Sequence, residues 1–135
     1  MGVSERPVKL LLDTHAFIWA IASPERLSRR AAEALRATGN QLHLSSATPW
    51  ELATKFRIGK LPEAARILDD LDSLAADLLA RQLPITHAHA MRAGSLKADH
   101  RDPFDRMLAA QAQLEGMQVV TRDPAFQGLG VDVLW

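Results

Sequence analysis

The sequence predicts a single α/β domain of three layers, with a central parallel sheet of about four or five strands between flanking helices. Three observations support this fold class. Short apolar or alternating runs, which are typical of strands, are separated along the chain by segments with helical periodicity. Parallel strands need crossover connections of this kind. A chain of 135 residues is also long enough for one sizeable core but too short for two comfortable domains.

The first two predicted strands lie in the N-terminal third of the chain. Residues 8–12 (VKLLL) form a continuous apolar run, which is compatible with a strand buried on both faces. A helix-like segment follows Asp13, and a further helix is predicted within 23–40, where Ser28 is a suitable N-cap. The alternation of apolar and polar residues in QLHLSS (41–46) predicts the second strand.

The next two helices are predicted from capping residues and from apolar periodicity. Thr48 is the expected N-cap of one helix, Pro49 its first residue and Gly59 the residue just past its end. Residues 63–81 are predicted as one long helix, because apolar side chains recur on one face while aspartates populate the other.

The helix predicted over 101–116 has the clearest ends in the chain. Asp102 is its expected N-cap, Pro103 follows the cap, and Gly116 closes the helix. The other predicted elements are a short strand at 83–86, a brief helix that ends at Gly94, and strands at 117–121 and 131–135 separated by a loop or a turn of helix.

Composition limits the classes of function. Lysine plus arginine equals aspartate plus glutamate, 16 each, so any nucleic-acid interaction must depend on local patches of charge. The lack of cysteine excludes disulfides, thiolate metal sites and thiol nucleophiles. No apolar stretch approaches the roughly 20 residues of a membrane span. The first eight residues lack an apolar signal core, so we expect a cytoplasmic protein with no membrane partner. Residues 1–7 are expected to be a flexible segment before a domain at 8–135.

Acidic residues occur at the predicted ligand-binding edge of the sheet. Open parallel sheets bind ligands in the crevice beyond the carboxyl ends of their strands. Asp13 directly follows the first strand, and Asp123 follows the VVT strand by two residues. Glu51 and Asp105 occupy the predicted first turns of helices that could point toward the same crevice. These four acids are therefore expected to converge.

Convergence of four carboxylates would be costly without compensation. Two carboxylates about 5 Å apart repel by roughly 3 kcal/mol at an effective dielectric constant near 20. Such a site should hold protons or bind a cation, and an all-oxygen set of ligands favours magnesium or manganese over zinc. These ions lower the pKa of bound water and polarise phosphoryl oxygens. The cluster therefore points to metal-assisted hydrolysis of phosphodiesters.

Each acid also has an ordinary structural explanation. Near the start of a helix, where Asp105 and Glu51 are predicted, a carboxylate favourably meets the positive end of the helix. Asp123 fits turn chemistry, and Asp13 fits a helix cap, although capping alone does not require an acid after each matching strand. Spacing alone leaves both interpretations open.

Four segments of the chain are familiar in their order: LLLDTHAFIW, SSATPWELATKFRIGKL, HRDPFDRMLAAQAQLEGMQVVTRDPAF and the closing GVDVLW. Together they resemble the PIN-domain family, specifically the VapC-like ribonuclease toxins of bacterial toxin–antitoxin systems. No single motif is decisive, but the ordered set is specific and extends from about residue 9 to the C-terminus. The resemblance implies a PIN-like fold and a magnesium-dependent endoribonuclease.

The resemblance also implies roles for individual acids. One or two magnesium or manganese ions, which activate water to cut RNA, would be held by Asp13, Glu51, Asp105 and Asp123. In DPFDR, Asp105 rather than Asp102 matches the family's metal ligand, and Asp102 keeps the role of helix cap with a possible supporting role behind the ligands.

Supporting residues follow from the same resemblance. Thr14 and Thr121 resemble the hydroxyl neighbours that orient the acids. The family commonly has a serine and an apolar residue before WE, where this chain has Thr48 and Pro49, and Thr48 is expected to cap the helix as serine does. Basic residues that could contact RNA phosphates, or that could equally be solvated surface charges, are Lys55, Arg57, Lys60, Arg101, Arg106 and Arg122.

The implied partners are an RNA substrate, a second copy of the chain in a homodimer, and a cognate VapB-like antitoxin whose C-terminal segment covers the acidic groove. Two alternatives use a similar fold. A catalytically silent PIN-like module would bind RNA or protein, but retention of all four acids argues against it. A phosphatase or receiver-like domain is disfavoured, because His15 stands where phosphatases of the haloacid dehalogenase type have a second aspartate, and no phosphate-binding glycine loop is present.

Overall fold

A five-stranded sheet forms the centre of the molecule, with strand order β3-β2-β1-β4-β5 and every neighbouring pair parallel. This computed structural model describes residues 7–135, so the predicted flexible segment lies outside the described residues except for Pro7. The strands are β1 (Lys9–Leu12), β2 (Gln41–Ser45), β3 (Ala80–Leu83), β4 (Gln118–Val120) and β5 (Val133–Leu134). The predicted parallel sheet of about four or five strands is confirmed.

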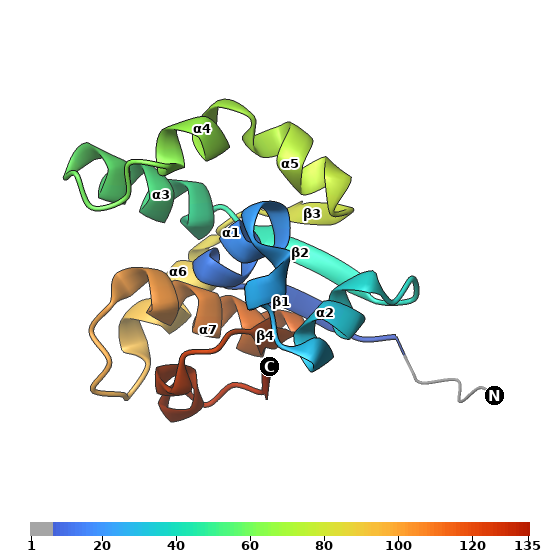
Figure 1. Cartoon of the computed structure of the whole chain (residues 1–135). Coiled ribbons are helices and arrows are strands. Elements are labelled where there is room, and N and C mark those ends of the chain that lie inside the picture. Colours follow the sequence, from blue (N-terminus) through green and yellow to red (C-terminus); the bar gives the residue numbers. More distant parts are fainter. Residues whose placement is uncertain (1–6) are drawn as a thin grey trace.

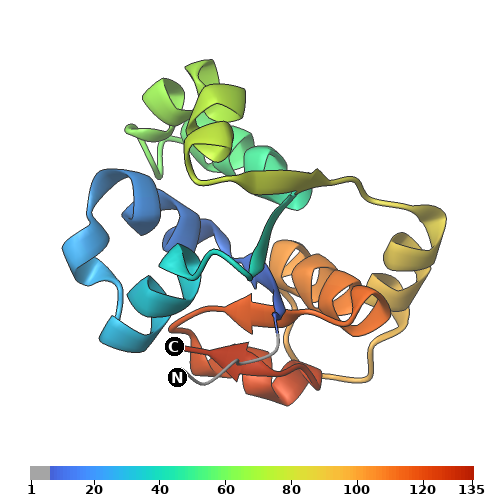
Figure 2. The same cartoon turned by 90° about the vertical axis from the view of Figure 1, so that its right-hand side faces the viewer.

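Helices cover both faces of the sheet, as Figures 1 and 2 show. They are α1 (Thr14–Ala22), α2 (Arg29–Arg36), α3 (Ala47–Arg57), α4 (Ala64–Asp69), α5 (Leu71–Asp77), α6 (His87–Ser95) and α7 (Pro103–Glu115), with the short 3-10 helices η1 (Pro24–Arg26) and η2 (Pro124–Leu129). None of the helices within residues 7–135 has the length and apolar character needed to cross a membrane.

Alternation along β1 divides the core into two halves. Leu10 and Leu12 face α1, α2 and α4, whereas Leu11 faces α6, α7 and η2, and all three side chains are fully buried. In Figure 2, α1 and α2 accordingly lie on one side of the sheet and α6 and α7 on the other. The three consecutive leucines are buried on both faces of the sheet, and such a continuous apolar run is the signal from which the strand was predicted.

The segment predicted as one helix over 63–81 is divided differently, and that prediction was wrong. It contains α4 and α5, which are separated at Asp70, and then β3. Asp70 leaves the helical region with φ −121° and ψ 23°, and Leu79 turns the chain into β3 with φ 58°. Both short helices pack apolar residues on the same half of the core, so the periodicity continued across the break. The strand predicted at 83–86 consequently begins three residues earlier, at Ala80.

Helix α3 begins earlier than predicted, so Thr48 is not its N-cap. The helix begins at Ala47, whose N–H donates to the Ser45 hydroxyl over 2.9 Å. The N-cap position is Ser46, which makes no side-chain capping bond, so Ser45 satisfies the first N–H of the helix instead. The Thr48 side chain is instead fully buried, and its hydroxyl has no hydrogen-bond partner among the described residues. The predicted end of the helix is confirmed, since Gly59 follows it with φ 76°.

Arg106 on α7 anchors the loop between α6 and α7. Its guanidinium donates hydrogen bonds of 2.6–3.2 Å to the backbone carbonyls of Ala93, Leu96, Ala98 and His100. One carbonyl in the last turns of α6 and three in the following loop are satisfied by one planar fork of donors, which suits arginine and not lysine. This loop ends at the first turn of α7, so Arg106 fixes the position of residues at the edge of the sheet.

We predict that Arg106→Lys lowers the free energy of unfolding by about 2–3 kcal/mol, because an ammonium cannot bond all four carbonyls at once. Urea denaturation followed by circular dichroism measures the loss. Arg57→Lys is the matched control, because Arg57 is exposed and the same exchange there should change stability by less than about 0.5 kcal/mol. Equal stability of the Arg106→Lys and wild-type proteins would contradict the anchoring role.

Candidate active site

The sheet has a topological switch between β1 and β4. The chain leaves β1 to build β2 and β3 on one side, and it returns to place β4 and β5 on the other. The connections after β1 and β4 therefore diverge to opposite faces and leave a crevice at the carboxyl ends of these strands. The Asp13 N–H donates to the Val120 carbonyl over 3.1 Å, so the two strand ends are joined directly beside this crevice.

Asp13 caps α1 at this switch and is almost completely buried. Its Oδ1 accepts the Ala16 N–H over 2.7 Å, and 7% of the residue is exposed. Burial raises the pKa of Asp13 above the ordinary value of an aspartate, and the nearby charge of Glu51 raises it further. Hydrogen bonds from the Thr121 hydroxyl and the Ala16 N–H act in the opposite direction. The site thus keeps a carboxylate where its charge is poorly compensated.

Thr121 connects Asp13 to Asp123. The same hydroxyl that hydrogen-bonds Asp13 accepts the Asp123 N–H over 3.0 Å. The Asp123 side chain is exposed and caps η2, with Oδ1 accepting the Ala125 N–H over 3.0 Å. The predicted turn role of Asp123 is therefore real, and it coexists with a position beside Asp13, since both residues line one pocket of about 660 Å³.

Glu51 reaches the crevice from α3. It is the fifth residue of this helix, so the prediction that it lies in the first turn was wrong. The reason is the same as for Thr48: the helix begins earlier than predicted. Its carboxylate is buried, accepting the Thr14 hydroxyl at Oε1 and pairing with the Lys55 ammonium at Oε2, both over 2.5 Å. Thr14 is the first residue of α1, so the hydroxyl that orients Glu51 adjoins Asp13 in the chain.

Asp105 approaches from the first turn of α7. Asp102 caps this helix, as predicted, by accepting the N–H groups of Phe104 and Asp105. The Asp105 Oδ2 lies 2.8 Å from His100 Nε2. Burial raises the pKa of Asp105 to about 6, with the charges of Asp102 and Glu51 adding to the effect and the His100 contact opposing it.

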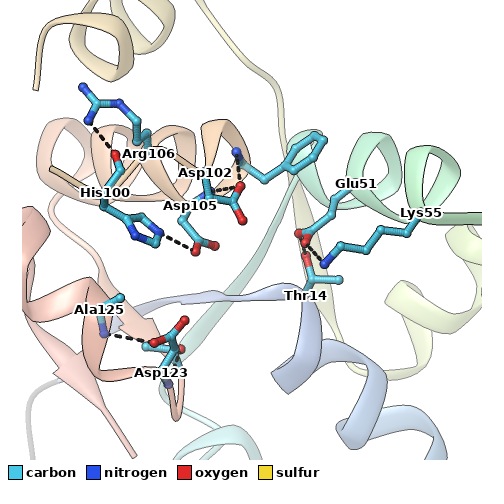
Figure 3. Close-up of polar contacts among 11 residues, drawn as sticks. Thr14, Glu51, Lys55, His100, Asp102, Asp105, Arg106, Asp123 and Ala125 are labelled. Atoms are coloured by element: carbon cyan, nitrogen blue, oxygen red, sulfur yellow. Dashed lines mark hydrogen bonds and ion pairs between the residues drawn. The ribbon is translucent and has the colours of Figure 1, made fainter. Parts of the chain in front are cut away.

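The four acids thus gather at one edge of the sheet, but they do not form a closed cage. Figure 3 shows Glu51, Asp105 and Asp123 on three sides of a common region. Glu51 is close enough to raise the pKa values of both Asp13 and Asp105. Within residues 7–135, however, no three acidic or histidine side chains stand in the arrangement of a metal site. Glu51 and Asp105 are engaged with Lys55 and His100 instead.

The chemistry of these residues fits a hard divalent cation. All the candidate ligands are carboxylate oxygens, which suit magnesium and manganese rather than zinc. Burial and mutual repulsion raise the pKa values of Asp13 and Asp105, so a cation would gain from charges that the protein leaves poorly compensated. To ligate one ion together, Glu51 and Asp105 would exchange Lys55 and His100 for the metal.

Two of the basic residues expected to contact RNA are already engaged. Four of the five N–H donors of Arg106 are engaged, with the carbonyl of Ala93 at the end of α6 and with three carbonyls of the α6–α7 loop. Lys55 pairs with Glu51. Arg57 and Arg122 are exposed, and Arg122 lies against the ring of Trp19.

His100 and the pairing of Lys55 with Glu51 were not predicted from the sequence. The spacing of four residues between Glu51 and Lys55 on one helix was a usable signal for an ion pair. His100 lies in a loop five residues before Asp105, and no periodicity connects the two.

Comparisons with known proteins show which family the chain resembles. The family model described as "PIN domain" matches residues 10–131. The chain is 32% identical over 115 residues to the Mycobacterium tuberculosis (strain ATCC 25618 / H37Rv) protein named Ribonuclease VapC22, covering 84% of this chain and 86% of that protein.

Two solved structures share the fold. VapBC2 from Rickettsia felis, bound to a DNA fragment from its promoter, aligns with a TM-score of 0.70 and 17% identity over 93% of this chain and 97% of that chain. FitAcB from Neisseria gonorrhoeae aligns with a TM-score of 0.61 and 22% identity, over 92% and 95% of the two chains.

We predict that the Asp105 carboxyl makes stability depend on pH. Its pKa is 3.8 ordinarily and about 6 in the folded chain, so the folded state binds the proton more strongly. The free energy of unfolding should therefore fall as the pH rises through this window, by roughly 2–3 kcal/mol from Asp105.

Urea denaturation of the wild type and of Asp105→Asn, in chelator at several pH values from 4 to 7.5, isolates this contribution as the difference between the two proteins. Asp69→Asn controls for loss of a surface carboxylate and should change stability by less than about 0.5 kcal/mol. A difference between wild type and Asp105→Asn that stays constant with pH would contradict the shift.

Proposed function

The chain belongs to the PIN domain family, and from that premise we propose that it is a divalent-metal-dependent endoribonuclease, the toxin of a VapBC-like toxin–antitoxin pair. One observation carries the proposal: Asp13, Glu51 and Asp105 are withdrawn from water beside Asp123 at the switch point of the sheet. A ribonuclease is also what the name of the M. tuberculosis relative states for that protein. An RNA substrate places the proposed activity in the cytoplasm.

In the proposed mechanism the carboxylates of Asp13, Glu51, Asp105 and Asp123 would hold one or two magnesium or manganese ions. When bound, such a cation would lower the pKa of a water and offset negative charge on the phosphodiester oxygens. The chain's own hydroxyls position the ligands: Thr14 orients Glu51, and Thr121 links Asp13 to the backbone of Asp123. Asp102 supports Asp105 by fixing the first turn of α7. The oxygen of water adds to phosphorus while one phosphodiester P–O bond breaks, and the leaving ribose oxygen takes one proton of the water as the other passes to the phosphate monoester or to solvent.

Lys55 and His100 have a second role in this proposal. The Lys55 ammonium pairs with the buried Glu51 carboxylate over 2.5 Å, and His100 Nε2 lies 2.8 Å from the partly buried Asp105 carboxyl. An unpaired buried carboxylate is expensive. The two basic groups therefore stabilise the fold when no cation is bound, and they compete with the cation for Glu51 and Asp105.

The partners proposed are a VapB-like antitoxin and a second copy of the chain. An antitoxin segment with a basic side chain would complement the acidic edge, and the similar folds of known structure include "VapBC-1 from nontypeable Haemophilus influenzae" and a "toxin-antitoxin complex from Klebsiella pneumoniae". The surface that we propose for the homodimer is apolar and lies on or just after α3. About half of each of three large side chains is exposed there: Trp50, Phe56 and Ile58. Light scattering of the purified chain, alone and with the product of a neighbouring small gene, tests both partners.

We predict that Asp13→Asn and Asp105→Asn each reduce RNA cleavage by at least about 100-fold while the domain stays folded, because each removes a charged ligand from the centre. The measurement is the rate of cleavage of labelled RNA in magnesium, with circular dichroism as the check on folding. Asp102→Asn is the matched control on the same helix, because asparagine caps as well as aspartate and should leave the rate within a few fold.

Excess EDTA should abolish cleavage by the wild type, and added magnesium or manganese should restore it. Full activity in EDTA, or full activity of Asp13→Asn, would eliminate the metal mechanism. A chain that binds RNA with no cleavage under any condition would instead be the catalytically silent module.

A further inference from the structure

The pocket that contains Asp13 and Asp123 continues along α1 into a basic region that the proposed mechanism does not use. Besides Asp13 and Asp123, the charged and aromatic residues that line this pocket of about 660 Å³ are one further acid, Glu63, together with His15, Trp19, Arg26 and Arg122. We propose that Arg26 and Arg122, both held against Trp19, form a binding subsite for a phosphate of the RNA strand next to the scissile bond. This inference rests on the proposed endoribonuclease function.

Trp19 gives the subsite a rigid support. The indole is 6% exposed, and its ring is packed 5.8 Å from Trp135 and 5.7 Å from His15 between ring centroids. The guanidinium carbons of Arg26 and Arg122 lie 4.7 and 4.8 Å from its centroid. Contacts of this kind attract a guanidinium to the face of an indole ring. Two long side chains that would otherwise be mobile are thus placed before any ligand arrives.

The two arginines keep their hydrogen-bonding capacity. Both are exposed, and none of the four ion pairs in the described part of the chain includes Arg26 or Arg122. Two like charges beside one indole repel each other, and an anion between or beside them would relieve that repulsion. A guanidinium that stacks by its face still presents N–H donors at its edge, which match phosphate oxygens.

Position favours an RNA phosphate as this anion. Arg122 directly precedes Asp123, and Arg26 reaches the same pocket from η1, so a strand whose scissile phosphate lies at the acids has a further phosphate within this basic region. Lys55 and Arg106, the other basic groups near the acids, are already engaged. Arg26 and Arg122 are therefore substrate-positioning residues in this proposal. An acidic protein segment is the competing occupant.

The test measures binding of a fluorescent 12-nucleotide single-stranded RNA of mixed sequence as a function of salt, in magnesium and in the Asp105→Asn background to prevent cleavage. For single strands, each lost phosphate contact reduces the slope of log K against log salt by about 0.7. We expect Arg26→Gln and Arg122→Gln each to lower the slope by about this amount, with Kd raised about fivefold, and the double variant to lose about twice as much slope.

Two further variants separate this role from general charge or from folding. Arg30→Gln removes an equally exposed arginine on α2, outside the pocket, and should keep the slope of the parent. Arg26→Lys retains the charge and should recover most of the slope, which a purely structural contact with Trp19 would not predict. Slopes for Arg26→Gln and Arg122→Gln that match the Arg30→Gln slope would overturn the proposal. The proposal would also be overturned if Arg26→Gln and Arg122→Gln left the RNA slope unchanged but weakened the binding of a polyglutamate peptide.

Steady-state cleavage by the otherwise wild-type chain distinguishes failure of this inference from failure of the proposed function. Arg26→Gln and Arg122→Gln should raise KM several-fold with kcat within about twofold, since the contact is made equally in the ground and transition states. If Asp13→Asn cuts RNA as fast as the wild type, the nuclease proposal fails and the phosphate subsite fails with it. If the acids behave as proposed but both arginine variants keep the wild-type KM and slope, only the subsite is wrong.

Discussion

Repulsion among carboxylates that are withdrawn from water is the constraint on which the rest of this structure depends. Asp13 and Glu51 are 7% and 4% exposed, and the pKa values of Asp13 and Asp105 are raised by burial and by their acidic neighbours. A folded chain tolerates such a cluster only if other groups offset it. Hydroxyls, one ammonium and one imidazole do so here, and each of them contacts an acid directly.

The parallel topology explains why these acids meet at all. β1 and β4 are neighbours in the sheet although more than 100 residues separate them, and their connections diverge to opposite faces. That divergence leaves room at the strand ends for Asp13 and Asp123, while α3 and α7 bring Glu51 and Asp105 to the same edge from their first two turns. Arg26 and Arg122, which lie against Trp19, line the same pocket as Asp13 and Asp123. Acidic and basic side chains are therefore adjacent along one surface.

The sequence predicted the elements whose signals are local. Asp102, Pro103 and Gly116 mark the ends of α7 by their own side-chain and backbone preferences, and the structure confirms them. The break at Asp70 was not predictable in this way, because no glycine or proline marks it and both short helices bury apolar residues on the same face. Thr48 was misjudged because three residues of SSAT have side chains that can cap a helix, and the helix begins at Ala47, before Thr48. His100 lies in a loop and Arg26 in a 3-10 helix, where no periodicity connects distant residues, and the contact of Arg26 with Trp19 on α1 depends on the tertiary fold.

The central claim is that the acidic edge is a site for a hard divalent cation, and anomalous diffraction from crystals soaked in manganese tests it most directly. The account predicts a manganese peak about 2.1 Å from carboxylate oxygens of both Asp13 and Asp105, with the Lys55 ammonium displaced from Glu51. A map with no peak at this edge, in which Glu51 and Asp105 keep their contacts with Lys55 and His100 at saturating manganese, would contradict it.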